Sequence, residues 1–190
     1  MDLEIAVKKA MEMEIQIRDI YTEALDACLE ETGKRFFAMM RDDEQYHHDY
    51  LEKRLGELSD SGRIQYRDDI RLNIPLEQEI AACVHEAHKS MAVEDRGVVQ
   101  QMLSNALRVE VLTSEFYDKM VSETQGPAKQ MFGRFLEIEN GHIAAVQAEL
   151  DYVMGTGYWF DFKEFDRSSE YVGAGLPATP GHVRTAGHPR

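Results

Sequence analysis

The sequence predicts an all-α fold, an up-down four-helix bundle with a long crossover connection that carries an extra helix. Apolar residues recur at steps of three and four along four long segments, as they do on the buried face of an amphipathic helix. The chain is 43% hydrophobic and 29% charged, and its five prolines lie mainly toward the end. The first two segments also resemble the last two, which indicates a duplicated helix pair. A length of 190 residues fits one compact domain.

The first pair of helices is expected over about residues 3–31 and 33–58. The apolar stripe of the first runs from Val7 to Cys28, and the helix is expected to end near Gly33. The stripe of the second runs from Phe37 to Leu55, and the polar run up to Gly62 breaks it. Each helix therefore has one face to bury.

The second pair of helices follows a polar connection. Pro75 is a suitable first residue for a crossover helix over about residues 75–91, because proline is tolerated in the first turn. The third long helix is expected over about 96–124, stopping before Gly126, and the fourth over about 127–154. Residues 1–157 would thus form the bundle.

Residues 158–190 differ in composition from the rest. The stretch 158–165 is rich in aromatic residues and is expected to pack back on the bundle. From about Gly173 onward, glycine, proline, arginine and histidine predominate, which predicts a mobile C-terminal tail.

The net charge and the two cysteines argue against several classes of function. With 35 acidic against 21 basic residues the net charge is −14, which argues against nucleic acid or an anionic membrane as a partner. No run approaches the ~18 apolar residues of a spanning helix, and the first residues lack the apolar stretch of a signal peptide. Cys28 and Cys83 form no Cys-x-x-Cys pair. These features predict a reduced, cytoplasmic protein.

The internal repeat relates polar residues that lie on the apolar stripes. A shift of 95 residues superposes the second helix on the fourth, and a shift of 96 superposes the first on the third. The polar residues that these shifts relate are Glu14 and Glu110, Tyr21 and Tyr117, Glu44 and Glu139, and His47 and His142.

Ionisable groups on a buried stripe need compensation, because a buried carboxylate must be paired, protonated or bound to metal. In each Glu-x-x-His pair the two side chains project from one helix face. A Glu from each of two helices with a Glu-x-x-His from each of the other two is the two-metal pattern of ferritin-like bundles. Iron or manganese suits these ligands, and zinc could occupy the same cage; we expect two iron ions. The predicted metal ligands are Glu14, Glu44, His47, Glu110, Glu139 and His142.

Four motifs resemble the rubrerythrin-like branch of the ferritin-like superfamily. They are MEMEIQIRDIY around Glu14, DDEQYHH around Glu44, RVEVLTSEFY around Glu110 and EIENGH around Glu139, and the likeness covers roughly residues 3–165. The resemblance implies a non-haem di-iron centre that reacts with hydrogen peroxide or oxygen. It also implies self-association into a homodimer or a higher homo-oligomer.

The chain departs from that family in two ways. Typical rubrerythrins carry a further glutamate one turn beyond the ligand of the third helix, where this chain has Thr113, with Ile17 at the related place in the first helix. The set is therefore more similar to the six-ligand bacterioferritin type. The rubredoxin-like domain with its Cys-x-x-Cys pairs is also missing from this chain. The resemblance then implies an external electron donor, such as a rubredoxin-like protein.

Three functions are compatible with these residues. The leading hypothesis is a di-iron oxidoreductase that reduces hydrogen peroxide; the others are a ferroxidase that handles iron and a redox-inert metal-binding protein. Tyr21 and Tyr117 lie two turns beyond Glu14 and Glu110, so they either hydrogen-bond ligand carboxylates or serve as core aromatics. The histidines at 85 and 88 are interpreted as surface residues.

Overall fold

A computed structural model of the chain describes residues 2–67, 70, 96–156 and 159. These residues form four long helices and no strand, which confirms the all-α prediction of a helical bundle. The crossover helix predicted at 75–91, the histidines within it, residues 160–165 of the aromatic segment and the tail predicted from about Gly173 lie outside the described residues. The helices are α1 (Leu3–Ala27), α2 (Glu31–Ser61), α4 (Arg96–Glu123) and α5 (Gly126–Thr156).

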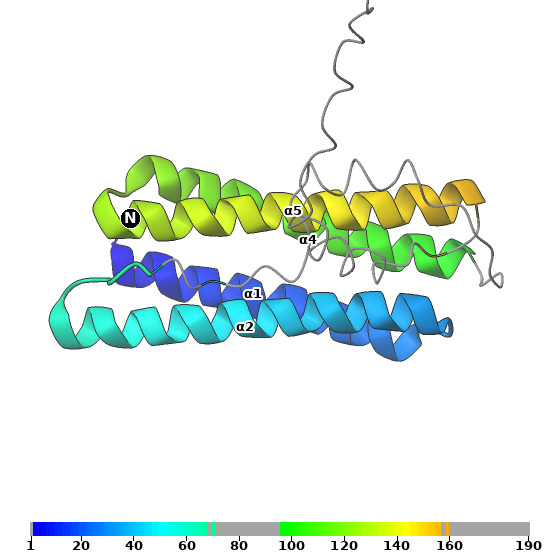
Figure 1. Cartoon of the computed structure of the whole chain (residues 1–190), viewed down its shortest axis with the longest axis horizontal. Coiled ribbons are helices and arrows are strands. Elements are labelled where there is room, and N and C mark those ends of the chain that lie inside the picture. Colours follow the sequence, from blue (N-terminus) through cyan, green and yellow to red (C-terminus); the bar gives the residue numbers. More distant parts are fainter. Residues whose placement is uncertain (1, 68–69, 71–95, 157–158, 160–190) are drawn as a thin grey trace, which may run out of the picture.

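The helices form two antiparallel pairs. α1 packs against α2 and α4 packs against α5, while α1 and α4 bring the two pairs together. Figure 1 shows the two pairs as two layers with their long axes roughly aligned. None of the described helices has a stretch long and apolar enough to cross a lipid bilayer.

The ends of the first two helices differ from the expected ones. The Asp2 side chain caps α1, since its Oδ1 accepts hydrogen bonds from the backbone N–H of Glu4 at 2.9 Å and of Ile5 at 3.3 Å. α1 then ends at Ala27 rather than near residue 31, and α2 already begins at Glu31. α2 continues beyond residue 58 to Ser61, where Gly62 supplies the left-handed backbone, with φ of 68°, that ends many helices.

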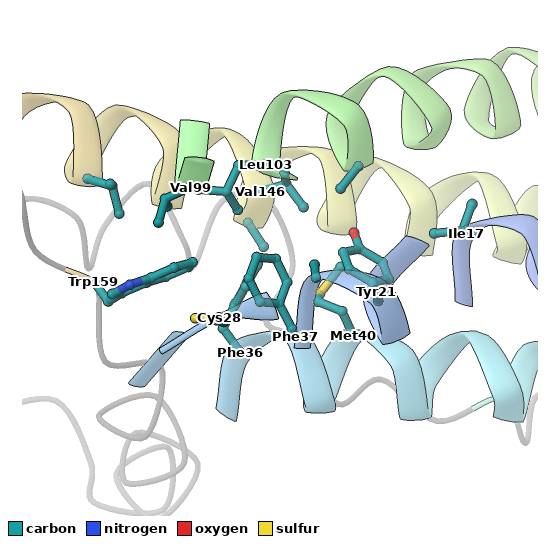
Figure 2. Close-up of a cluster of buried hydrophobic side chains, with 14 of the residues drawn as sticks. Ile17, Tyr21, Cys28, Phe36, Phe37, Met40, Val99, Leu103, Val146 and Trp159 are labelled. Atoms are coloured by element: carbon teal, nitrogen blue, oxygen red, sulfur yellow. The ribbon is translucent and has the colours of Figure 1, made fainter. Parts of the chain in front are cut away.

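Gly33 lies inside α2 and is a site of close approach, not a helix end. A Cβ atom there would lie 2.5 Å from Trp159 Cε2 and 2.6 Å from Cys28 Sγ. Trp159, the described residue of the predicted aromatic segment, is buried, and its ring meets Phe37 edge-on with the centroids 5.3 Å apart. Figure 2 shows Trp159 beside Cys28, Phe36 and Phe37. The absence of a side chain at residue 33 therefore makes room for this aromatic cluster.

Two apolar clusters fill the interior. The first holds the aromatic cluster around Trp159 and extends to Tyr21 and Met40, as Figure 2 shows. The second contains Tyr117, Phe132 and other apolar residues from the opposite end of each helix. Along every helix, the residues of one cluster precede the predicted ligands and those of the other follow them. The polar residues are thus held in the middle of the bundle between two apolar layers.

Candidate metal centre

All six predicted ligands are buried. The four glutamates have no exposed surface and the two histidines are 1% exposed. Each helix contributes from its middle: α1 and α4 one glutamate each, α2 and α5 one Glu-x-x-His pair each. The residues concerned are Glu14, Glu44, His47, Glu110, Glu139 and His142.

Glu44 lies between the two imidazoles. Its Oε1 is 2.8 Å from His142 Nδ1, and its Oε2 is 3.1 Å from His47 Nδ1. The two rings are stacked with their centroids 5.4 Å apart and their planes 20° from parallel. One carboxylate therefore faces both imidazoles, with one of its oxygens directed at each ring.

The remaining glutamates surround the same two nitrogens. Glu14 Oε2 lies 3.4 Å and Glu139 Oε1 4.0 Å from His47 Nδ1, while Glu110 Oε2 lies 3.7 Å from His142 Nδ1. One ligand atom from each member of the two Glu-x-x-His pairs falls within 4.8 Å of every other. The structure thus brings the six residues, which span 129 positions of the chain, into one cluster.

Many atoms of this cluster have no hydrogen-bond partner among the described residues. A buried polar atom without a partner costs about 1–3 kcal/mol, and more when it is charged. Oxygen and imidazole nitrogen atoms with free lone pairs are what divalent iron, manganese or zinc requires. The residues therefore fit a metal ion on grounds of donor chemistry. The atoms that make no hydrogen bond of acceptable geometry are Glu14 Oε2, Glu44 Oε1, Glu110 Oε2, both Oε atoms of Glu139, and His142 Nδ1, although Glu44 Oε1 and His142 Nδ1 lie within ion-pair distance of each other.

The two tyrosines of the repeat bond crosswise to the cluster. The Tyr21 hydroxyl, on α1, donates to Glu110 Oε1 on α4, and the Tyr117 hydroxyl, on α4, donates to Glu14 Oε1 on α1. Both rings are fully buried. Burial raises the pKa of both hydroxyls well above 10, as do the charges of the adjacent carboxylates, so each hydroxyl keeps its proton as a donor. Each tyrosine can thus orient the carboxylate of the opposite helix.

Burial and mutual repulsion shift the pKa values of the carboxylates. Burial raises the pKa of Glu44 to about 7, against the lowering effect of the His142 charge. Burial, and then the charges of neighbouring carboxylates, raise the pKa of Glu139 well above its usual value. Burial alone would raise the pKa of Glu14 as well, but the hydrogen bond and charge of His47 lower it. The crowded carboxylates thus share protons or need cations.

The pKa values of both imidazoles are raised, whereas burial alone would lower the pKa of a histidine. Burial lowers the pKa of His47, but hydrogen bonds and charges from Glu14 and Glu44 outweigh it and raise the pKa to about 9. The carboxylates likewise raise the pKa of His142 well above 6.5, against burial. Without metal, protons on the imidazoles neutralise part of the negative charge, and a divalent cation has to displace them.

Two further polar residues lie in this region. Asp43 is 2% exposed, and its Oδ2 lies 3.8 Å from His142 Nε2. The predicted stripe did not include it, although it lies three residues after Met40 and four before His47 and so shares their buried face. Thr113 is fully buried, with no hydrogen-bond partner for its hydroxyl in the described part of the chain. Its counterpart Ile17 belongs to the first apolar cluster.

Comparisons with protein-family models, with curated proteins and with solved structures found no match.

Proposed function

We propose that this chain is a non-haem di-iron oxidoreductase, rubrerythrin-like, which reduces hydrogen peroxide with electrons from an external donor. The observation that carries the proposal is the repeated set of four buried carboxylates and two imidazoles, most of which have unpartnered donor atoms. Two iron ions would match two imidazoles and four carboxylates in number and charge.

The proposal divides the six residues between two ions. Glu14 and His47 would hold one ion, and Glu110 and His142 the other, because each of these pairs is in contact in the structure. Glu44 faces both imidazoles and would be shared. Glu139, its counterpart in the repeat, would be shared as well. The ligand set is then symmetric about the centre of the bundle.

The residues around the carboxylates exclude water and fix the positions of the side chains. Reduction of hydrogen peroxide to two molecules of water takes two electrons and two protons, and bound iron would supply the electrons and polarise the oxidant. The two apolar clusters on either side exclude water from the carboxylates. Tyr21 and Tyr117 hold one oxygen of Glu110 and of Glu14, which leaves the other oxygen of each for an ion. An external donor is part of the proposal, because the chain has two cysteines and no Cys-x-x-Cys pair.

The ferritin-like topology belongs to the same proposal. In Figure 1, α2 and α4 run in the same direction, so the chain between them would have to return along the bundle. The start of that return is described: Arg54 Nη1 donates to the Gln65 carbonyl at 2.6 Å, and the Tyr50 hydroxyl donates to the Arg67 carbonyl at 3.1 Å. The segment after Gly62 thus runs back beside α2, which supports a crossover connection.

The test is the reaction of iron-loaded protein with peroxide. Protein loaded with ferrous iron without oxygen is mixed with one equivalent of hydrogen peroxide, and oxidation is followed optically beside the same amount of free ferrous ion. Faster oxidation by the protein, with two irons oxidised per peroxide, supports the proposal. Iron that reacts rapidly with oxygen but not with peroxide indicates a ferroxidase, and iron that stays inert to both indicates a redox-inert metal-binding protein.

A further inference from the structure

The internal repeat is broken beside the metal centre. The shift of 95 residues that relates His47 to His142 places Ile138 at the position of Asp43. Both of these side chains are buried, Asp43 with 2% and Ile138 with 1% of its surface exposed. One half of the molecule thus carries a buried carboxylate where the other half carries a buried hydrocarbon side chain.

Asp43 faces the edge of His142 that points away from the other ligands. His142 Nδ1 faces Glu44 and Glu110, whereas its Nε2 lies 3.8 Å from Asp43 Oδ2. A small side-chain rotation would bring the two atoms within hydrogen-bond distance. The carboxylate of Asp43 is therefore placed to accept a proton from Nε2, which would leave the Nδ1 lone pair for a cation.

His47 has a different environment. Its contacts with carboxylates in the described structure, to Glu14, Glu44 and Glu139, are all made by Nδ1. The residue that the repeat relates to Asp43 is Ile138, which has no acceptor to offer Nε2. The two imidazoles are thus supported unequally although their ligand sets match.

We propose that Asp43 is a positioning residue that makes the two metal positions unequal, so that the position at His142 binds a divalent cation more tightly and fills before the position at His47. The inference rests on the proposed two-metal function. An acceptor on the second nitrogen fixes the tautomer and the orientation of a ligating imidazole and makes it a better donor, and loss of such a partner costs about 10–100-fold in affinity.

The test is a titration of the metal-free chain with cobalt(II), followed by calorimetry and by visible absorption. The wild type is expected to bind in two steps whose affinities differ by roughly 10–100-fold. Variants with one histidine removed then assign the steps. Asp43→Asn should weaken cobalt binding by that factor in a His47→Ala background and leave it unchanged in a His142→Ala background. Asp42→Asn is the matched control, because Asp42 is exposed and paired with Arg41.

The outcomes separate the inference from the function on which it rests. Two equal steps in the wild type, or the same loss from Asp43→Asn in both backgrounds, overturn the inference and leave the two-metal site standing. A wild-type chain that takes up no cobalt overturns the inference and the proposed function together.

A measurement on the unmodified chain decides the question even if Asp43→Asn does not fold. In the zinc-loaded protein, long-range nitrogen–proton NMR correlations report which imidazole nitrogen carries the proton. We expect the proton of His142 on Nε2, exchanging with water more slowly than the Nε2 proton of His47. Equal exchange at the two rings, or zinc bound through Nε2 of His142, would contradict the inference.

Discussion

Glu44 is a buried carboxylate that lies between two imidazoles, and its pKa is shifted by both burial and its neighbours. Its two oxygens face the imidazoles of His47 and His142. Burial raises the pKa of Glu44 to about 7, and the hydrogen bonds and charges of Glu14 and Glu44 raise the pKa of His47 to about 9. In the metal-free chain, bound protons therefore reduce the repulsion between the buried carboxylates. A cation and these protons compete for the same atoms, so pH should act oppositely on the two forms.

The first prediction concerns the pH dependence of stability. The folded-state pKa of His47, about 9, exceeds its ordinary value of 6.5, so its contribution is present below pH 6.5 and is lost as the pH rises through 9. Glu44, raised from 4.5 to about 7, acts in the same sense at lower pH. The melting temperature of the metal-free chain should therefore fall between pH 6.5 and 9. With zinc bound it should hold or rise, because binding requires deprotonated ligands. Parallel curves for the two forms would contradict this.

The second prediction concerns the crossed tyrosines. Tyr117→Phe leaves Glu14 without a hydrogen bond to its buried Oε1, and we expect the metal-free chain to lose about 1–3 kcal/mol of unfolding free energy. Tyr21→Phe should do the same through Glu110. Urea unfolding measures both, with and without zinc. The loss should be smaller with zinc, because the cation neutralises the carboxylate; an equal loss in both forms would show that the hydroxyls serve packing only.

At the scale of the elements, the turn between α1 and α2 depends on a contact made far along the chain. Glu30 caps α2 by accepting a hydrogen bond from the Thr32 backbone N–H at 3.1 Å, so the second helix begins before Gly33. Gly33 then faces Trp159, which follows the last helix. The glycine serves the docking of that tryptophan rather than the end of a helix.

The third prediction compares two glycines of α2. Gly33→Ala adds a Cβ at 2.5 Å from Trp159 and should destabilise the chain by about 1–3 kcal/mol through overpacking. Gly56→Ala is the matched control: nothing lies within 4 Å of its Cβ, and a better helix former should stabilise by about 0.5–1 kcal/mol. Thermal unfolding with tryptophan fluorescence, from the single Trp159, measures both. Similar effects of the two substitutions would contradict the close approach at residue 33.

At the scale of the whole molecule, the sequence predicts those features that follow helical periodicity. The four helices and the burial of the candidate ligands could be predicted, because apolar and polar residues share stripes with steps of three and four. Features set by contacts between distant elements could not. No periodicity indicates that Asp43 meets His142, that each tyrosine bonds across to the other half, or that Gly33 faces Trp159. These depend on how the helices are rotated against one another.

The repeat also explains why one centre can form between two halves. Each half supplies three candidate ligands and one tyrosine, and each tyrosine bonds to a glutamate of the other half. Neither half alone would complete the ligand set or satisfy its carboxylates. The proposed centre therefore requires the assembled bundle, and removing Glu44 and Glu139 should abolish it.

The metal content of the chain tests this account most directly. Protein reconstituted with ferrous iron without oxygen and then desalted is analysed beside two double variants: Glu44→Ala, Glu139→Ala within the centre, and Glu12→Ala, Glu52→Ala at exposed positions of α1 and α2. We predict about two irons per chain in the wild type and in the surface variant, and none retained in the centre variant while its helical circular dichroism persists. A wild type that retains no iron, or a centre variant that retains as much as the wild type, would contradict the account.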